Sequence, residues 1–415
     1  MAGKLIVLML DGISAEYVAA EWRRLPHLAA LAERGFSVER LRAETGGTSF
    51  PGRTSMVTGV TADVSGVYAN KIWDGAGFRY ASPDDVRVPT VAGRAKAAGR
   101  DVAVVGYGMV RPEDAEIFVP PFWAANYVER ARGGQAPAAA TGWGRVAAPR
   151  APHPRFVQAV TAAGLPTAWT APPADGAPGA VHHHLIDDLL AIQWTAALAA
   201  GEMPPDLVLA EVNCPDAYQH DAGYRSGPAD WSIAYADMLV GLLAARLAAS
   251  GRDRVYNLAV MSDHGHSPIE RAIRPDFIIP DATFQADGSL LYVLPRDAAD
   301  LARIEAALAP YGVTRHASDH LPVDQRERIV TFAAPERTSF EHSPGHPATG
   351  PVMAPRYPSS HGLPAGHPGD DRFAVFAGPD VPRGRAATAA ATQVAPTFAA
   401  LLGLLLTDYP GRPVF

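Results

Sequence analysis

Three aspartates stand after apolar runs of the sequence, at positions where they could share one site. Asp11 directly follows KLIVLML, Asp216 comes shortly after LVLAEV, and Asp263 follows YNLAVMS. His220 lies four residues after Asp216, and His264 is next to Asp263. Carboxylates held close together repel one another unless cations neutralise them. Asp and His are donors that suit Zn²⁺ or Mn²⁺ better than Ca²⁺, so the set predicts a metal site.

Each of these residues has an ordinary structural interpretation when it is taken alone. An Asp after a strand commonly begins a helix or a turn. Asp216 and His220 could form a surface pair one helical turn apart, and Asp263 with His264 could make a turn at a strand end. The repetition of the pattern after three different apolar runs is what favours the metal site.

The elements that would position these groups alternate along the chain. Short apolar runs predict buried strands, and longer amphipathic stretches predict helices. The expected strands are 4–10, 101–107, 205–212, 255–261 and 372–378, and the expected helices include 25–35, 230–251 and 393–403. This alternation predicts an α/β fold with a doubly wound, mostly parallel central sheet and helices on both faces. Ligands of such sheets bind outside the carboxyl ends of the strands, where the three aspartates would converge.

Two regions break the alternation. Residues 111–180 are rich in Ala, Pro and Gly, which predicts a lid-like surface excursion within a core domain of residues 1–266. Residues 267–350 contain a small strand–helix–strand pattern of their own, at 289–295, 297–312 and 328–335. We therefore expect an inserted α+β cap at 267–350, with residues 351–415 returning to the core domain.

Composition narrows the function classes. Among 415 residues, 48% are hydrophobic and 19% are charged, which is enough to bury a large core. The net charge is −7 and no Lys/Arg block occurs, so we expect no nucleic-acid partner. The run IVLML near the N-terminus is too short to span a membrane or to form a signal-peptide core. We therefore expect a cytoplasmic protein without membrane contact, and the single cysteine, Cys214, excludes an internal disulfide. The oligomeric state stays open.

Ser49 lies in the segment TSFPGRTSMVTG, which reads as the start of a helix. No histidine occurs between His27 and His153, so no neighbour in sequence could act as its base. Ser49 could simply begin the helix, a role that Thr48 would fill equally well. Alternatively it is a nucleophile, because coordination to a metal ion lowers the pKa of a hydroxyl without a separate base. A helix N-terminus also favours a phosphate anion.

Taken together, the motifs resemble the alkaline phosphatase superfamily, in its branch of type I phosphodiesterases and nucleotide pyrophosphatases. The resemblance spans Lys4 to Gly411 and is weakest in the excursion and the cap. It rests on Asp11-Gly12, on Ser49-Phe50-Pro51 continuing to Val57-Thr58-Gly59, on Asn70 through Asp74, on Pro215-Asp216 with His220, and on Ser262 to Gly265.

The resemblance implies two divalent metal ions, expected to be Zn²⁺ with Mn²⁺ as the alternative, about 4 Å apart. The first ion would be held by Asp11, Ser49, Asp263 and His264, and the second by Asp216, His220 and a later histidine. His361, followed by Gly362, matches the family position, and His367 is the alternative. His266 is expected behind the ligands or on a loop. The run His182–His184 is expected to be a solvated helix start, with orientation of substrate as the other interpretation.

Three residues are expected to bind substrate: Gly52, Arg53 and Asn70. The phosphodiesterase branch carries Asn where this chain has Gly52, and this departure leaves the substrate class open. Arg53 could replace that amide as a bidentate clamp on phosphoryl oxygens, or it could be a surface residue at the helix start. Gln219 replaces a family Gly, which we expect to alter only a turn.

The implied activity is hydrolysis of a small phosphodiester or nucleotide through Ser49 and a covalent phosphoryl-enzyme. A phosphonate hydrolase resembling phosphonoacetate hydrolase, or a phosphomonoesterase, could use the same core. A sulfatase is a further alternative, because Ser49-x-Pro51-x-Arg53 has the spacing of that family. A binding protein that kept only the fold would have lost metal ligands, and every expected ligand position is filled.

Overall fold

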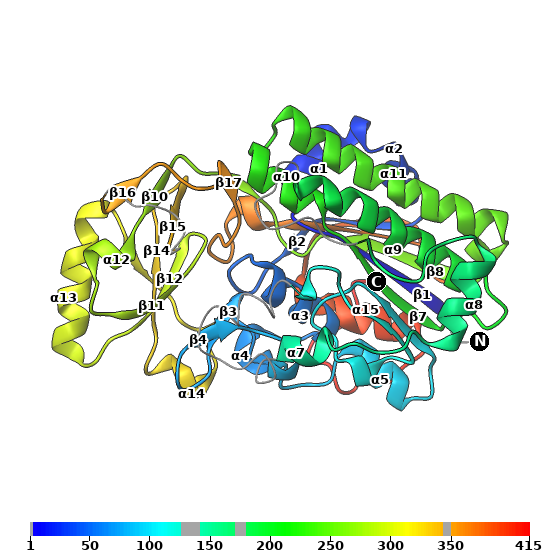
Figure 1. Ribbon diagram of the computed structural model, residues 1–415, viewed down its shortest axis with the longest axis horizontal. Helices are drawn as coiled ribbons and strands as arrows, with labels where there is room; N and C mark the ends of the chain where they lie inside the picture. Colours follow the sequence, from blue (N-terminus) through cyan, green and yellow to red (C-terminus); the bar gives the residue numbers. More distant parts are fainter. Residues whose placement is uncertain (1–2, 126–141, 171–179, 343–349) are drawn as a thin grey trace.

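The computed structural model describes residues 3–125, 142–170, 180–342 and 350–415. Its central sheet has eight strands. They are β1 (Lys4–Leu10), β2 (Phe36–Arg42), β5 (Val102–Val105), β6 (Ile117–Val119), β7 (Leu207–Val212), β8 (Tyr256–Met261), β18 (Arg372–Ala377) and β19 (Gly384–Ala390). Their order is β19-β2-β18-β8-β1-β7-β5-β6, and Figure 1 shows this sheet on the right of the molecule.

The sheet is parallel except at one strand. β18 runs antiparallel to both of its neighbours, β8 and β2, and every other pairing is parallel. β1 lies between β7 and β8, so the carboxyl ends of these three strands are adjacent. The predicted mostly parallel sheet is confirmed, and with it the juxtaposition of the segments that follow the three strands.

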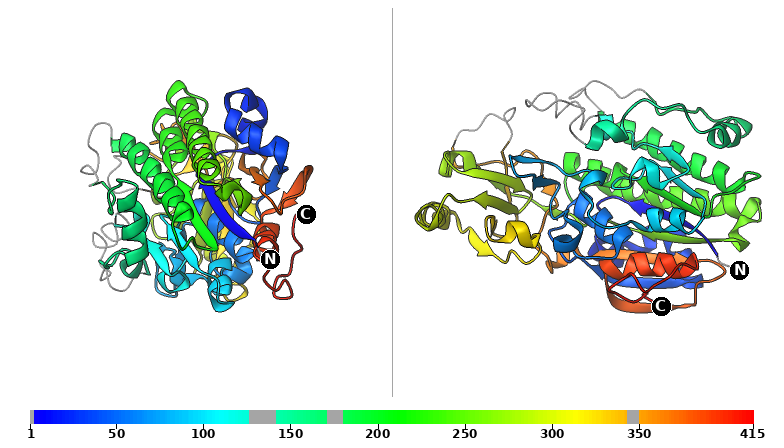
Figure 2. Two further views of the ribbon diagram at one scale, coloured as in Figure 1. Left: turned by 90° about the vertical axis from the view of Figure 1, so that its right-hand side faces the viewer. Right: turned by 90° about the horizontal axis from the view of Figure 1, so that it is seen from below.

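Helices cover both faces of the sheet, as the doubly wound prediction requires (Figures 1 and 2). On β1 alternate side chains point to opposite faces. Ile6 and Leu8 join a core cluster with α1 (Ala15–Glu21), α2 (Pro26–Arg34), α9 (His183–Ala200) and α11 (Gly227–Ala249). Leu5 and Val7 join a second cluster with α3 (Ser49–Thr58), α5 (Val91–Ala97) and α15 (Val394–Leu401). Both faces of the strand are therefore buried, which explains its continuous apolar sequence.

One helix of the described residues, α11, is long and apolar enough to span a membrane by length and composition. It packs against α2, α9 and α10 (Cys214–Ala222), and Leu239, Val240 and Leu243 belong to the core cluster on that face of the sheet. These contacts account for its apolar character within this fold.

A smaller α+β region lies beside the sheet, on the left of Figure 1. Its four-stranded antiparallel sheet consists of β11 (Thr283–Asp287), β12 (Leu290–Leu294), β14 (Val330–Ala333) and β13 (Thr314–His316), in that order. Helix α13 (Ala298–Leu308) packs on it through Ile304 and Leu308. We call residues 267–353 the cap, because β16 (Val352–Met353) still pairs with β10 (Arg271–Ile273), just past the predicted end at residue 350.

The segment 111–180 is predicted to be a lid-like surface excursion, and parts of its described residues instead belong to the core. β6 is an edge strand of the central sheet. Helix α7 (Gly142–Val146) buries Trp143, and α8 (Pro154–Ala162) buries Phe156 against Trp194. A few aromatic side chains anchor the segment despite its Ala- and Pro-rich composition. The predictions for residues 126–141 and 171–179 lie outside the described residues.

Candidate metal centre

The three aspartates converge at the adjacent ends of β1, β7 and β8. Nε2 of His264 lies 3.1 Å from Oδ1 of Asp11 and 3.9 Å from Oδ1 of both Asp216 and Asp263. Gly12 makes this approach possible, because its φ is +77° and a Cβ there would lie 3.0 Å from Cβ of Asp216. Segments separated by about half of the chain therefore meet in one cluster.

The first candidate metal group consists of Asp11, Asp263 and His264, whose ligand atoms all lie within 4.8 Å of one another. One oxygen of each carboxylate is already held. Oδ2 of Asp11 accepts a hydrogen bond from Arg53 at 2.6 Å, and Oδ1 of Asp263 accepts one from the backbone N–H of Gly12 at 3.2 Å. Oδ2 of Asp263 is buried and accepts no hydrogen bond from the described residues. Such an oxygen is suited to a cation.

The second candidate group consists of Asp216, His264, His266 and His361. Asp216 lies in the first turn of α10. The two later histidines meet because β17 (Ser359–Ser360) pairs with β9 (Ser267–Pro268) in register Ser360 with Ser267. His266 precedes β9 and His361 follows β17, so this short ladder places their rings 5.4 Å apart.

His266 lies in the loop between β8 and β9, as the sequence predicts, and it also belongs to the second candidate group. It is buried, and its Nε2 lies 2.8 Å from Oδ1 of Asp216, whereas Nε2 of His220 lies 3.5 Å from the same oxygen. Nδ1 of His220 faces the backbone oxygen of Ser359 at 3.1 Å. A backbone acceptor at one ring nitrogen orients the other nitrogen toward a metal. His266 and His220 therefore both flank Asp216.

The structure separates the two candidates for the last ligand. Nε2 of His361 lies 3.7 Å from Oδ1 of Asp216, inside the second group. Nε2 of His367 instead lies 3.1 Å from the exposed Glu336, and its Nδ1 accepts a hydrogen bond from Gly369. His361 is therefore the histidine that lies in the cluster.

Ser49 is the first residue of α3 and faces the cluster. Its Oγ lies 3.1 Å from Nε2 of His264. Thr48 makes no capping hydrogen bond through its side chain, and the start of α3 is instead held by Oδ1 of Asn70, which accepts from the N–H of Phe50 at 2.9 Å. Asn70, predicted to bind substrate, thus also fixes the turn that presents Ser49.

Gly52 and Arg53 do not lie where a substrate would contact them. A Cβ on Gly52 would come 2.2 Å from the backbone oxygen of Asp263, so Gly52 permits α3 to pack directly against that strand end. Arg53 is only 2% exposed, which excludes the surface interpretation. Its guanidinium lies 2.6 Å from Asp11, 3.2 Å from Glu211 and 3.4 Å from Asp263. Nη2 and Nε of Arg53 thus face carboxylates of the protein, not a site where they could bind phosphoryl oxygens of a substrate.

The electrostatics of the cluster favour a bound cation. Burial, with the repulsion of Asp263 next, raises the pKa of Asp11 to about 7. Burial disfavours a charged His264, yet the carboxylates of Asp263 and Asp11 outweigh it and raise the pKa of His264 to about 10. Burial lowers the pKa of His266 to about 4, which keeps its ring neutral, as a metal ligand must be.

Two supporting residues, Glu211 and Asp188, were not predicted from the sequence, and Gln219 was expected only to alter a turn. Glu211 is buried near the carboxyl end of β7 and accepts from Trp123 Nε1 at 2.7 Å. Asp188 is buried and accepts from the N–H groups of Asn213 and Cys214 at 2.9 and 2.8 Å, which holds the start of α10. Gln219 donates to the carbonyl of Gly12 at 2.7 Å, so it braces the turn after β1. A charged residue inside the apolar run LVLAEV was the signal that could have revealed Glu211.

The His182–His184 run lies at the predicted helix start, before and within the first turn of α9, but only His182 is exposed, so the start is not solvated as a whole. Nδ1 of His182 lies 2.5 Å from the hydroxyl of Tyr218, and Nε2 of His183 lies 2.7 Å from Asp187 one turn later. The ring of His184 packs edge-on against Phe122 at 5.0 Å. These contacts anchor the start of the helix.

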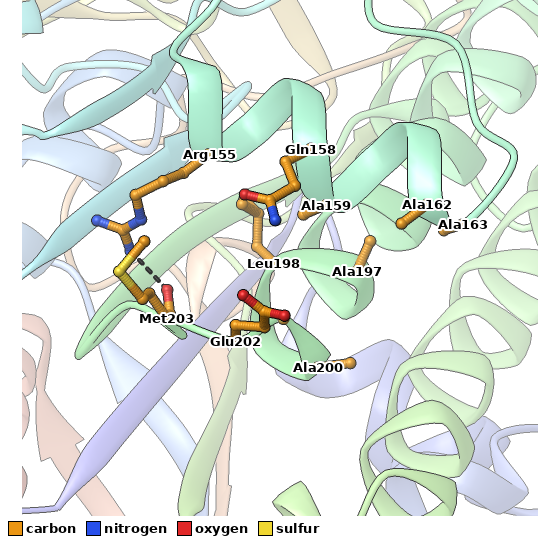
Figure 3. A pocket seen from close by; sticks show the side chains of 11 residues that line it. Arg155, Gln158, Ala159, Ala162, Ala163, Ala197, Leu198, Ala200, Glu202 and Met203 are labelled. Atoms are coloured by element: carbon orange, nitrogen blue, oxygen red, sulfur yellow. Dashed lines mark hydrogen bonds between the residues drawn. The ribbon is translucent and has the colours of Figure 1, made fainter.

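A cavity of about 260 Å³ lies between the cap and the hairpin of β3 (Lys71–Trp73) and β4 (Phe78–Tyr80). Asn70, Lys71, Tyr80 and Arg356 line it, as does Ser360 next to His361. A second cavity of about 310 Å³ lies between α8 and the C-terminal end of α9 (Figure 3). Alanine side chains form much of its wall, and it contains none of the predicted site residues.

Comparison with known proteins agrees with this architecture. The family model of type I phosphodiesterase / nucleotide pyrophosphatase matches residues 5–365. Murine ectonucleotide pyrophosphatase / phosphodiesterase 5, solved as an inactive variant in complex with AMP, superposes with TM-score 0.69 at 16% identity, covering 99% of this chain and 97% of that chain. The human protein of that name gives 0.70 at 15% identity, with the same coverage. No curated protein sequence matches. The chain belongs to the type I phosphodiesterase / nucleotide pyrophosphatase family and is a phosphoric ester hydrolase of the alkaline phosphatase superfamily.

Proposed function

We propose that this chain hydrolyses phosphodiester or pyrophosphate bonds of nucleotide-sized substrates, with Ser49 as nucleophile and two divalent metal ions as cofactors. The observation that carries the proposal is the position of Ser49 at the first turn of α3, with its Oγ 3.1 Å from His264 in the middle of the carboxylate cluster. The AMP complex of the murine relative supports a nucleotide as the substrate class.

The residues present fit two divalent ions. Asp11, Ser49, Asp263 and His264 would hold the first, and among the described residues the buried Oδ1 of Asp11 and Oδ2 of Asp263 accept no hydrogen bond, which favours a cation there. Asp216, His220 and His361 would hold the second, with His266 contacting Asp216 beside them. Carboxylate and imidazole donors of this kind suit Zn²⁺, with Mn²⁺ as the alternative. When bound, such ions lower the pKa of a hydroxyl and neutralise charge on phosphoryl oxygens.

The proposed reaction has two steps, both of which depend on Ser49. Oγ of Ser49 attacks the phosphorus atom, a P–Oγ bond forms, and the bond to the leaving oxygen breaks. Water next cleaves the phosphoryl–serine bond and restores the hydroxyl. Asn70 keeps the turn of Ser49 in place through Phe50, which preserves the attack geometry. The positive end of the α3 backbone faces the anionic group.

The first test replaces the nucleophile. We predict that Ser49→Ala lowers turnover of a bis-aryl phosphate by at least about 1,000-fold, as removal of a covalent nucleophile does in other enzymes. Its metal content, measured by elemental analysis, should remain close to that of the unmodified protein, because several other ligands stay in place. Substantial activity in a metal-loaded Ser49→Ala protein would disprove the assignment.

Substrate class is tested separately with three compounds. The cavity beside Ser360 carries the cations Lys71 and Arg356, and both pack on tyrosine rings, Lys71 at 4.7 Å from Tyr80 and Arg356 at 5.0 Å from Tyr357. The carboxylates of Asp287 and Glu341 line the same cavity, so its charges are mixed. Its tyrosine rings suit a leaving group with an aromatic part, as in a nucleotide. Comparison of kcat/KM for a bis-aryl phosphate, an aryl phosphate and phosphonoacetate distinguishes the diesterase from the two alternatives on the same core.

A further inference from the structure

Arg53 is a buried cation placed directly under the carboxylates of the first metal group. It lies one helical turn after Ser49 on α3, so one helix delivers both the proposed nucleophile and this guanidinium to the site. The close packing at Gly52, whose Cβ position is filled by the backbone oxygen of Asp263, sets the depth of the helix. The position of Arg53 thus follows from the packing of α3 on the end of β8.

The two oxygens of the Asp11 carboxylate have different contacts. Nη2 of Arg53 donates to Oδ2 of Asp11 at 2.6 Å, while Oδ1 of the same carboxylate faces His264 at 3.1 Å. One oxygen is thus tied to the protein interior and the other points into the site. Oδ2 of Asp263, 3.4 Å from Nε of Arg53, lies on the same guanidinium.

A second anchor fixes the guanidinium itself. Glu211 lies 3.2 Å from Nε of Arg53 and is held by the N–H of Gly108 at 3.1 Å and by Nε1 of Trp123 at 2.7 Å. The ring of Trp123 also lies 5.6 Å from the guanidinium carbon. Arg53 therefore has a rigid support in β7 and the following loops, which a residue that only neutralised charge would not need.

We propose that Arg53 is a positioning residue, which turns one oxygen of Asp11 toward the divalent ion beside Ser49 and limits that carboxylate to a single metal-facing oxygen. This inference rests on the proposed two-metal site. Residues that orient metal ligands through hydrogen bonds typically change metal affinity by 10- to 100-fold when they are replaced. The effect should be confined to the ion beside Ser49, since Arg53 has no ion pair with Asp216 among the described residues.

The charge of Arg53 and its orienting role predict opposite changes in metal affinity when Arg53 is replaced, so the two can be distinguished by experiment. Removal of the guanidinium makes the site more negative, which by Coulomb attraction alone would tighten the binding of a cation. Loss of orientation would weaken it. The double variant Arg53→Met/Glu211→Leu removes one positive and one negative charge, so net charge is unchanged and the loss of orientation is isolated. Replacing both partners with apolar groups also avoids an unpaired buried Glu211.

The experiment is a calorimetric titration of metal-free protein with Zn²⁺, in which the two ions give two binding steps. For the double variant we expect one step to weaken by about 10- to 100-fold and the other to stay within about twofold. Arg53→Lys, which keeps the charge but not the planar fork, should weaken the same step. To assign each binding step to a site, Co²⁺ replaces Zn²⁺ and the absorption spectrum of bound Co²⁺ is followed. Ser49→Ala should change the spectrum of the ion beside Ser49, and His361→Ala that of the ion beside Asp216.

A matched control removes a partly buried ion pair from the cap. Arg274 is 4% exposed and pairs with Asp276 at 2.8 Å, so Arg274→Met/Asp276→Leu should leave both steps unchanged. Equal weakening of both steps in the Arg53 variants would indicate general destabilisation and overturn the inference, as would affinities equal to those of the unmodified protein. Failure of the unmodified protein to bind two ions would instead contradict the proposed function itself.

Discussion

The metal centre and the cap both bury charged side chains, but they balance those charges in opposite ways. In the cap, Asp300 is shared by two arginines, Arg296 at 2.8 Å and Arg303 at 2.7 Å. At the ends of the central strands the ratio is reversed. Asp11, Glu211 and Asp263 surround one guanidinium, that of Arg53.

The difference indicates which of the two regions needs a bound counterion. A buried carboxylate without a partner costs several kcal/mol, so a fold keeps such a group only where another interaction compensates. Asp300 in the cap is compensated by its two neighbouring arginines. The acids of the strand ends are compensated only in part, and the raised pKa of His264, about 10, shows that the cluster attracts positive charge. A divalent ion is the natural counterion for such a cluster.

The largest expected effect comes from removal of metal. Dialysis against a chelator should abolish hydrolysis of a bis-aryl phosphate, and Zn²⁺ or Mn²⁺ should restore it. Added metal should also raise the unfolding temperature, because an ion present at about 100 times its Kd stabilises the folded state by about 2.7 kcal/mol. If elemental analysis finds no transition metal in fully active protein, the acids at the strand ends do not need a bound cation. The contrast with the cap would then be wrong.

A second test compares two histidines that the sequence left as alternatives. His361→Ala should lower kcat/KM by at least about 100-fold, because it removes a ring from the cluster around Asp216. His367→Ala should change kcat/KM by no more than about threefold, since that ring contacts Glu336 at the surface. Elemental analysis should show loss of one ion in the first variant and none in the second. Reversed results would show that the ligand set is wrong.

The smallest expected effect concerns the cap alone. Burial, with His316 next, lowers the pKa of His320 to about 4, below the value near 6.5 of an unfolded chain. Between these values the unfolded chain binds more protons, so stability is complete above about pH 6.5 and decreases as the pH falls toward 4. In the His320→Leu variant, the loss of folding free energy between pH 6.5 and pH 4 should be smaller by on the order of 2 kcal/mol.

The measurement is the difference in unfolding temperature between the two metal-free proteins across that pH range. Asp319, Arg326 and His316 are present in both proteins, so their titration largely cancels. The two curves should run parallel above pH 7. Parallel curves over the whole range would show that His320 is not buried as described.

Much of the fold followed from local pattern. The predicted strands through Lys4–Leu10, Leu207–Val212 and Tyr256–Met261 are present because a strand buried on both faces must be continuously apolar. β2 and β19 were not predicted. Phe36–Arg42 carries alternating polar residues, and Gly384–Ala390 is mostly alanine and largely exposed, so neither contains an apolar run. Strands at one side of a sheet need less burial, and their sequences give a weaker signal.

Asp11, Asp216 and Asp263 could be grouped from the sequence alone, since parallel strands bring their carboxyl ends to one edge, where ligands of such sheets bind. The partners of Arg53 and the contact of His266 with Asp216 could not, and His361 was grouped with Asp216 only through the family resemblance. These contacts depend on the packing of α3 against β8 at Gly52 and on the pairing of Ser267 with Ser360, between residues more than ninety positions apart. Local periodicity carries no information about such contacts, because they form only when distant elements pack.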